Sequence, residues 1–403
     1  MAAVPRSGTP EKSAAPSRPV NQRSPAASAV MRRRLLASAA IAAAVVLLFV
    51  AYLRVSRTYT ENSDSANILL MSWDMLHGNL LLHGWYLSDV SFYPTELPQY
   101  AMLEGLFGLH ADIAHVAAVM TYTLVLLLAV LLARGRTSGR AAWPPMALTA
   151  GLMIAPQLGV GVFVLLLSVG HIGTAIPLML TWLVIDWAAT RPCLPGEPIV
   201  SAPGGAPPLR TPLADPPARA WFIPVIVGLL LTWVLVADPL VLVVAIVPLA
   251  AVCVMRVLRA VLSARPPDRG AALRASWYEV SLAAAAILAY GLAALVNRLL
   301  RASGGFAVHP LGYRLAPVHT WPKHAWVTGE GLLALFGAKP QGPAAEMAFA
   351  VLHLAGVALV AWAMWRVARR FVSWPDRSAR SCSSRWPSTW WCTCRARWPT
   401  RPT

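Results

Sequence analysis

Charged residues are scarce in this chain of 403 residues. Asp, Glu, Lys and Arg together make up 13% of it, whereas hydrophobic residues make up 57%. Soluble domains carry about 25% charged residues, because water must solvate most of their surface. The scarcity of charge therefore excludes an ordinary soluble globular protein and indicates a polytopic membrane protein.

Cysteines are also few, and none of the five falls in a segment that we expect on the extracytoplasmic side. The composition therefore predicts no disulfide framework. Cys392 and Cys394 are spaced as C-x-C, but neither a second cysteine pair nor a histidine lies nearby in the sequence. That pattern does not favour a zinc site.

Acidic residues number 17 against 34 basic ones, which gives a formal net charge of +17. The basic residues are nearly all Arg, and a strongly basic chain raises the question of nucleic-acid binding. Here the bases lie at the ends of apolar segments, so membrane topology explains them better. We predict no nucleic-acid partner.

Long apolar runs are abundant and predict the fold class. Residues 35–53 follow Arg32, Arg33 and Arg34, and a helix of that length covers about 28 Å, close to the thickness of the hydrocarbon core. The arginines predict an uncleaved signal anchor with a cytoplasmic N-terminus. Eight segments in all read as spans: 35–53, 113–133, 146–167, 172–190, 221–237, 239–255, 277–296 and 346–365.

We therefore expect an all-α, polytopic membrane helix bundle of about eight spans in the plasma membrane. Residues 1–31, rich in Ala, Pro and Ser, predict a disordered cytosolic arm, and residues 32–370 form the transmembrane domain. Two outer loops, 54–112 and 297–345, have room for chemistry and for interfacial helices.

Residues 371–403 have a different composition, typical of GC-rich DNA that is read out of frame. The last thirty residues carry five Trp, three Cys and six Arg but a single acid. One hypothesis is a frameshift near residue 374, which would leave an aberrant basic tail. The alternative is a genuine basic cytosolic tail.

The first outer loop concentrates the acidic residues. Residues 58–112 hold no Lys or Arg and seven of the seventeen acids: Glu61, Asp64, Asp74, Asp89, Glu96, Glu104 and Asp112. The pattern of residues 66–77 predicts a short helix that lies flat in the membrane interface, and residues 97–109 form a second amphipathic stretch.

Asp64 is the main catalytic candidate, because it precedes the predicted flat helix. One interpretation is that Ser63 or Asp64 caps that helix. The other is that the carboxylate serves as a general base for an incoming hydroxyl or amine, or helps to bind a divalent metal such as Mg²⁺ or Mn²⁺. The two interpretations are compatible. Asp89 and Glu96 are candidates for a second acid, and the alternative is that they are solvated turn or capping residues.

Two acid–histidine pairs have the spacing i, i+3 that places both side chains on one helix face. They are Asp74 with His77 and Asp112 with His115. Each pair is a candidate metal site. The alternative for Asp112 is that it stabilises the positive end of the following helix.

The second outer loop is basic and predicts contacts with phosphate. Arg301, Arg314 and Lys323 could hold the phosphate group of a substrate that lies between the two loops. The alternative is attraction to anionic lipid headgroups. Other candidates for the outer cavity are His171, Asp238 and His319, each expected in an outer turn or loop.

This arrangement resembles the GT-C superfamily of integral-membrane glycosyltransferases, in particular the branch of protein O-mannosyltransferases and aminoarabinose transferases. The resemblance rests on the cytoplasmic N-terminus, the acidic first outer loop with flat helices, the large second outer loop and the motif Ser63-Asp64-Ser65. It implies a bacterial cell-envelope enzyme that uses a polyprenyl-phosphate sugar donor on the outer face.

On this interpretation Asp64 would deprotonate the acceptor, and Arg301, Arg314 or Lys323 would hold the departing lipid phosphate. A transporter or lipid flippase is the alternative. Prolines interrupt several predicted spans, as transporters often require, but charged residues are nearly absent from the middle of the spans. A non-catalytic or truncated membrane protein is a further alternative.

Overall fold

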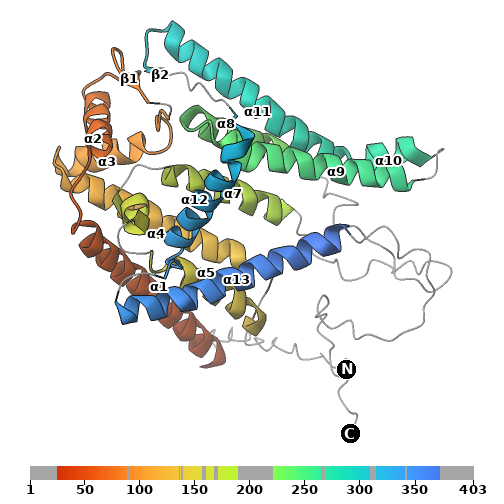
Figure 1. The fold of residues 1–403 in the computed structure, drawn as a ribbon, viewed down its shortest axis with the longest axis horizontal. Helices are drawn as coiled ribbons and strands as arrows, with labels where there is room; N and C mark the ends of the chain where they lie inside the picture. Colours follow the sequence, from red (N-terminus) through yellow and green to blue (C-terminus); the bar gives the residue numbers. More distant parts are fainter. Residues whose placement is uncertain are drawn as a thin grey trace, which may run out of the picture. The chain divides into compact units, whose positions relative to one another are not determined.

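The computed structural model consists almost entirely of α-helices (Figure 1). It describes the chain except for residues 1–24, 89, 136, 138, 157–159, 168–170, 189–220, 265–267, 309–314, 341–342 and 373–403. Residues 1–337 form one compact unit and residues 338–403 form another. The expected tail at 371–403 therefore lies almost wholly outside the described residues.

The first unit contains twelve of the labelled helices in its described part. They are α1 (Pro25–Ser56), α2 (Ser63–Leu76), α3 (Leu97–Phe107), α4 (Asp112–Arg134), α5 (Trp143–Met153), α6 (Val160–Val162), α7 (Ile172–Ala188), α8 (Phe222–Ala237), α9 (Val247–Ser263), α10 (Arg269–Ala275), α11 (Trp277–Ala302) and α12 (Trp321–Leu335). Short π-helical turns cover Phe163–Leu167 and Leu242–Ile246, and 3-10 turns cover Gly139–Ala142 and Val318–Thr320. The strands β1 (Tyr86–Leu87) and β2 (Ala307–Val308) form one short parallel pair.

The second unit contains α13 (Ala344–Val372). Near its C-terminal end, the guanidinium group of Arg366 lies 4.7 Å from the ring centre of Trp362, and that of Arg369 lies 4.3 Å from the ring centre of Trp365. Arginine and tryptophan stacked in this way are typical of a helix end at a membrane interface.

The apolar helices agree with a membrane protein. Within the described residues, five helical segments are long and apolar enough to cross a bilayer: Met31–Ser56, Asp112–Arg134, Leu242–Leu262, Trp277–Ala302 and Ala344–Arg366. The helices α7 and α8 are apolar but shorter. The all-α helical fold is thus confirmed, and its apolar helices suit a lipid bilayer, whereas the count of eight spans and the cytoplasmic N-terminus stay predictions. Residues 25–31, expected in the disordered arm, belong to α1.

Small residues bring α8 and α11 close together. Ala286 and Ala289 of α11 are fully buried in a core that also contains Val227 and Leu231 of α8. A Cβ atom at Gly228 would lie 3.5 Å from the Cβ atom of Ala285. Small side chains let helix backbones approach in a membrane, where dispersion contacts rather than the hydrophobic effect hold helices together.

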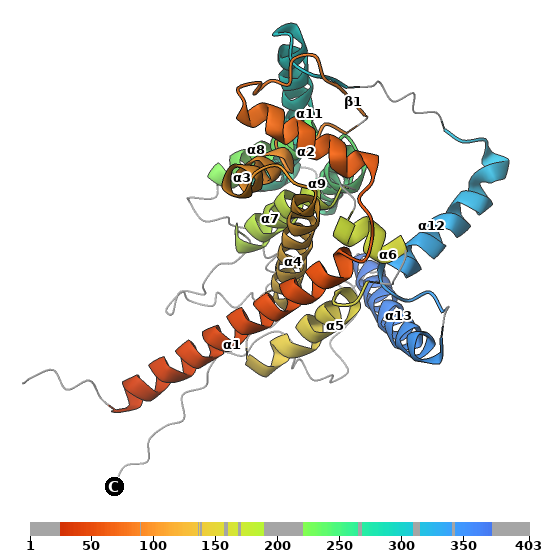
Figure 2. The ribbon, with the colours of Figure 1, turned by 90° about the vertical axis from the view of Figure 1, so that its left-hand side faces the viewer.

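The prediction of one continuous helix over residues 146–167 is wrong. The helix α5 ends at Met153, residues 154–156 are not helical, and the next described helix, α6, begins at Val160, so Figure 2 shows α5 and α6 as separate elements. Pro156 lies between them. Proline has no backbone N–H to donate, and its ring disfavours helical geometry in the residue before it, so the helix stops ahead of it.

Tyrosine hydroxyl groups bind the carbonyl groups that this interruption leaves without helical partners. Tyr122 of α4 donates to the carbonyl oxygen of Met153 at 2.5 Å, and Tyr52 of α1 donates to that of Ile154 at 2.7 Å. Unpaired backbone groups are costly inside a membrane, and a proline break is tolerated where neighbouring side chains pair with them. The two tyrosines thus join α1 and α4 to the end of α5.

We expect Tyr122→Phe to lower the free energy of unfolding in detergent by about 1 kcal/mol, because the partly buried hydrogen bond to the Met153 carbonyl group is lost. Chemical denaturation followed by circular dichroism measures the change. Tyr290→Phe is the matched control, since Tyr290 is an exposed residue of α11. Equal stability of both variants and the native chain would contradict this account of the break.

Candidate functional site

The two outer loops of the sequence meet at one end of the first unit. The strands β1 and β2 pair in parallel, with Tyr86 opposite Ala307 and Leu87 opposite Val308. Backbone hydrogen bonds extend the contact, because the N–H of Phe306 donates to the carbonyl of Leu81 at 2.9 Å. The acidic loop and the basic loop therefore lie on the same side of the bundle.

Two glycines allow this close contact. Gly304 has φ +77°, which disfavours other residues, and its carbonyl oxygen lies 2.7 Å from Nδ1 of His83. A Cβ atom at Gly305 would lie only 2.9 Å from the carbonyl oxygen of Leu81. The next residue, Phe306, is fully buried against Leu82 and other apolar side chains of the first loop.

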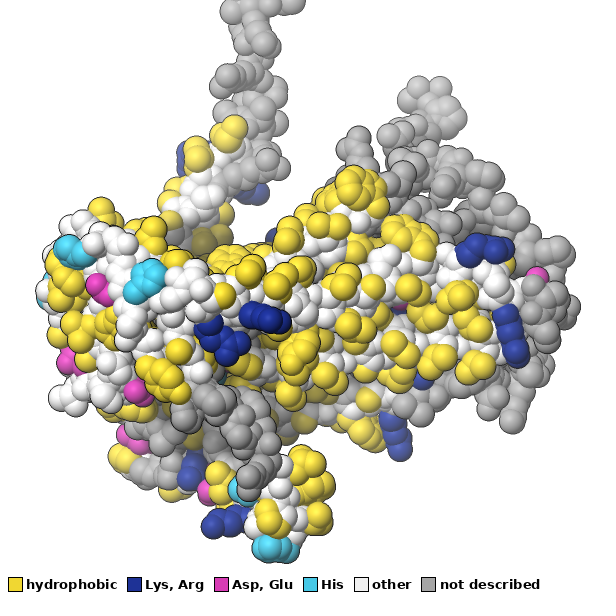
Figure 3. All heavy atoms as spheres, turned by 90° about the horizontal axis from the view of Figure 1, so that it is seen from above, with side chains coloured by type: hydrophobic (Ala, Val, Ile, Leu, Met, Phe, Trp, Pro, Cys, Tyr) yellow, Lys and Arg dark blue, Asp and Glu magenta, His cyan; other side chains and the backbone are white. Residues whose placement is uncertain are grey.

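Charge is segregated along the molecule. In Figure 3, acidic and histidine side chains gather at one end of the visible face, and hydrophobic side chains cover its middle. The polar end of this face carries the first outer loop, whereas α10 at the other end contributes Arg269 and Arg274. This distribution agrees with an interfacial polar face above a lipid-exposed bundle.

Asp64 lies in the first turn of α2, and Asn62 caps that helix. The Asn62 Oδ1 atom accepts hydrogen bonds from the backbone N–H and the hydroxyl of Ser65, both at 2.9 Å. The prediction that Ser63 or Asp64 is the cap is therefore wrong by one or two positions. The Asp64 side chain is exposed, and its negative charge suits the positive end of the helix.

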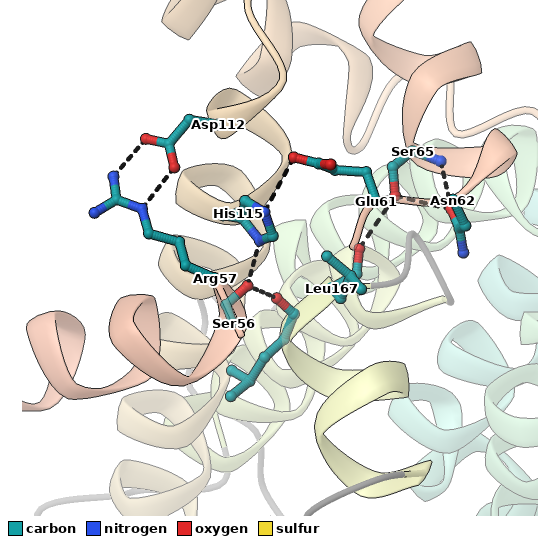
Figure 4. A network of polar contacts seen from close by, with 9 residues as sticks. Ser56, Arg57, Glu61, Asn62, Ser65, Asp112, His115 and Leu167 are labelled. Carbon is teal, nitrogen blue, oxygen red and sulfur yellow. Dashed lines mark hydrogen bonds and ion pairs between the residues drawn. The ribbon is translucent and has the colours of Figure 1, made fainter. Parts of the chain in front are cut away.

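A buried histidine connects α4 to the segment before α2 (Figure 4). The Nε2 atom of His115 lies 3.1 Å from Oε1 of Glu61, and its Nδ1 atom lies 2.8 Å from the hydroxyl oxygen of Ser56. Ser56 donates its proton to the carbonyl oxygen of Leu166 at 2.6 Å. His115 is 5% exposed, whereas the side chain of Glu61 is 32% exposed, so only Glu61 opens to the surface.

A second ionic contact joins the same two segments at the surface. The guanidinium group of Arg57 donates to both carboxylate oxygens of Asp112, at 2.6 and 2.5 Å. Asp112 and His115 therefore each have their own partner and do not converge on one ligand. The interpretation of this pair as a metal site is not supported.

The other acid–histidine pair also separates. Asp74 accepts hydrogen bonds from the side chains of Asn79 at 2.5 Å and Trp85 at 2.8 Å, whereas the Nδ1 atom of His77 lies 2.8 Å from the carbonyl oxygen of Trp73. Within the described part of the chain, no group of three or more His, Cys, Asp or Glu side chains is placed to hold a metal ion. The acid–histidine pairs that the structure describes thus do not fit Mg²⁺ or Mn²⁺.

Asp238 and His171 come together, as the sequence predicts for two residues of outer turns. Asp238 follows α8, and its Oδ2 atom lies 2.6 Å from Nδ1 of His171, just before α7. Asp238 is buried and also accepts a hydrogen bond from the N–H of Leu240. His171 has φ +60°, an unusual backbone conformation for a residue with a side chain.

Glu96 lies beside this pair and is buried, so its interpretation as a solvated turn residue is wrong. The hydroxyl of Thr95 donates to its Oε2 atom, and a Cβ atom at Gly173 would overlap its carboxyl group. Burial raises the pKa of Glu96 to about 7, and the negative charge of Asp238 adds to the rise, which the Thr95 hydrogen bond partly offsets. Glu96 is therefore a neutral acid over much of the acidic range.

Glu104 is a buried acid whose role the sequence interpretation missed. It is 1% exposed on the face of α3 that packs against α2, and burial raises its pKa to about 7, with a smaller lowering by the nearby Ser72 hydroxyl. Neither carboxyl oxygen has a hydrogen bond of normal geometry to a described residue. Glu104 follows Tyr100 by four residues and Leu97 by seven, so the three side chains share one face of a helix. Because the other two are buried apolar positions, this spacing was a signal for the burial of Glu104.

The remaining candidates stay apart from Asp64. Arg301 is exposed in the last turn of α11, where its Nε atom donates to the carbonyl of Asn297 at 3.3 Å. Lys323 is exposed in the first turn of α12, and His319 is exposed in the 3-10 turn before it. No hydrogen bond or ion pair in the described chain joins Asp64 to any of them. Asp89 and Arg314 lie outside the described residues.

We expect Glu104→Gln to reduce the pH dependence of stability. The pKa of Glu104 in the folded chain, about 7, exceeds its ordinary value of 4.5, so the folded state binds more protons between these values. Stability therefore falls as pH rises from about 4.5 to about 7, on the order of 2 kcal/mol for one such group.

Denaturation in detergent at pH 5 and pH 8 measures this difference. The native chain should lose stability at pH 8, and Glu104→Gln should lose less. Glu346→Gln, at an exposed position of α13, is the matched control and should behave like the native chain. An unchanged difference in Glu104→Gln would show that the buried carboxyl group does not titrate in this way.

Comparisons with protein-family models, with curated proteins and with solved structures found no match to this chain. The resemblance to integral-membrane glycosyltransferases therefore rests on the order of apolar segments, the two outer loops and the motif at Asp64.

Proposed function

We propose that this protein is a membrane glycosyltransferase of the plasma membrane. It transfers a sugar from a polyprenyl-phosphate donor to an acceptor on the extracytoplasmic face. One observation carries the proposal: the β1–β2 pair joins the acidic loop to the basic loop at one end of an apolar bundle. A lipid-borne phosphate sugar needs both a base for the acceptor and cations for the phosphate at the depth of the headgroups.

Asp64 supplies the base in this proposal. The acceptor hydroxyl oxygen attacks the anomeric carbon of the sugar, and the bond from that carbon to the phosphate oxygen breaks. The electron pair stays on the lipid phosphate, and the hydroxyl proton passes to the Asp64 carboxylate. An exposed position in the first turn of α2 leaves this carboxylate accessible to both substrates.

The interfacial helices support access from the lipid. Exposed apolar side chains of α2 and α3 include Leu70, Leu76, Leu106 and Phe107, whereas the opposite faces of these helices pack in the core. A helix with this division favours the boundary between headgroups and acyl chains. The polyprenyl chain of a donor lies in the same layer.

The departing phosphate requires cations, and the second outer loop supplies them. Arg301 and Lys323 are exposed in this loop, and Arg314 belongs to the same segment of the sequence. A guanidinium group binds two phosphate oxygens at once, which favours arginine at this position. No step requires a metal ion.

Transporters also contain interrupted helices like the one that is divided here into α5 and α6. The pairing of the carbonyl groups at this interruption nevertheless argues for the transferase. Transporters use the carbonyl oxygens of unwound helices to bind their ions. Here the hydroxyl groups of Tyr122 and Tyr52 donate to the carbonyl oxygens of Met153 and Ile154. Substrate-dependent flux in proteoliposomes, without transfer of a sugar, would favour the transporter instead.

We expect Asp64→Asn to lower the transfer rate by about 10²–10⁴-fold, because the amide cannot accept the hydroxyl proton. Transfer of radiolabel from a polyprenyl-phosphate hexose to acceptors in membranes measures the rate, and immunoblotting checks the protein level. Asp268→Asn, just before α10 at the other end of the bundle, is the control and should retain the native rate. Full activity of Asp64→Asn would refute the assignment.

We expect Arg301→Gln to raise the KM for the donor about tenfold or more, since a hydrogen bond to a charged group is worth about 1.5–3 kcal/mol. The kcat should change little, because the base remains. Arg274→Gln, exposed in α10, serves as the matched control. If both variants have the native KM, Arg301 does not bind the phosphate.

A further inference from the structure

We propose that Glu61 and His115 are positioning residues that hold the Asp64 carboxylate where it accepts the acceptor proton. This inference rests on the proposed function and adds two residues to its site. The carrying observation is the hydrogen-bonded chain from the Leu166 carbonyl through Ser56 and His115 to Glu61 (Figure 4).

The geometry determines the direction of each proton in this chain. A carbonyl oxygen accepts hydrogen bonds and cannot donate them, so the hydroxyl group of Ser56 donates its single proton to the carbonyl oxygen of Leu166. The Ser56 oxygen must then accept from the Nδ1–H of His115. The Nε2 atom faces Oε1 of Glu61 at 3.1 Å, so one proton lies between these two atoms.

This assignment excludes a serine nucleophile. Ser56 is fully buried, and its proton points away from the histidine, so His115 does not act as its base. The histidine is instead held in one tautomer and one orientation by Ser56, as occurs where a backbone carbonyl or hydroxyl fixes a functional imidazole ring. Its other nitrogen atom then fixes the carboxylate of Glu61.

Asp64 lies between two anchored residues. Glu61, three positions earlier, is held by α4 through His115, whereas Ser65, the next residue, is buried and bonded to the cap Asn62. The Ser65 hydroxyl also lies 3.4 Å from the carbonyl oxygen of Leu167 in the π-helical turn. Asp64 itself points outward, so its anchored neighbours determine where the carboxylate lies.

Simple anchoring does not require this pair. Arg57 and Asp112 already join the same connection to α4 at the surface. An apolar contact would anchor the chain at lower cost than a pair that buries the His115 ring, because burial removes polar groups from water. The directional hydrogen bonds of this pair also fix the orientation of the chain at Glu61. A catalytic carboxylate must be held to within about 0.5 Å of its productive position.

The test uses the full chain in proteoliposomes with a radiolabelled polyprenyl-phosphate hexose as the probe. We expect Glu61→Ala and His115→Ala each to lower kcat up to about 100-fold with an unchanged KM for the donor, since a displacement near 1 Å has an effect of that size. Arg57→Gln is the matched control, because it removes the neighbouring ionic contact to α4. It should keep the native kcat.

Two further variants separate positioning from loss of folding. Glu61→Gln should recover most of the rate, because its amide can donate to the unprotonated Nε2 atom of His115. Glu61→Ala should cause less than about a threefold further loss in the Asp64→Asn background, where no base remains to be positioned. The proposal would be overturned if Glu61→Ala lowered the rate by the same factor in the Asp64→Asn background as in the native chain. It would also be overturned if Arg57→Gln lowered kcat as much as Glu61→Ala does.

Hydrogen exchange distinguishes the failure of this inference from the failure of the proposed function. If the native chain transfers no label, the transferase proposal fails. Positioning is then decided by amide exchange in a peptide that covers residues 60–68. Faster exchange in Glu61→Ala and His115→Ala than in Arg57→Gln supports the anchoring of Asp64, and equal exchange in all three contradicts it.

Discussion

The pairing of buried backbone carbonyl groups is the constraint on which the rest of this structure depends. The helix α5 ends ahead of Pro156 inside an apolar bundle, and the carbonyl groups that lose their helical partners must find donors there. Tyr122 provides a donor at Met153, and Ser56 provides one at Leu166, which lies in the separate π-helical turn Phe163–Leu167. Because Ser56 uses its proton in this way, it can only accept from His115, so the same requirement orients the side chains of the candidate site.

The acidic residues of the first loop divide into two classes by environment. Glu96 and Glu104 are buried, and burial raises the pKa of each to about 7, so they pack as neutral acids at low pH. Asp64 is exposed and Glu61 partly so. The second class is open to the surface, and this accessibility is why the proposed function places the base at Asp64 and not at Glu96 or Glu104.

Much of the bundle follows from sequence patterns because lipid exposure demands long apolar runs. Segments such as 113–133 and 277–296 match α4 and α11 closely. The joining of loops 54–112 and 297–345 on one side also follows from counting spans. Side-chain pairs one helical turn apart were less informative, since Asp112 and His115 bind different partners.

The sequence by itself determined that this chain belongs in a membrane, where its helices begin and end approximately, and that its acids gather in one loop. Those properties depend on local composition and on the length of a bilayer span. Tertiary structure alone decided that Ser56, Glu61 and His115 meet. Such contacts join residues far apart in the chain, and their existence depends on how the helices pack.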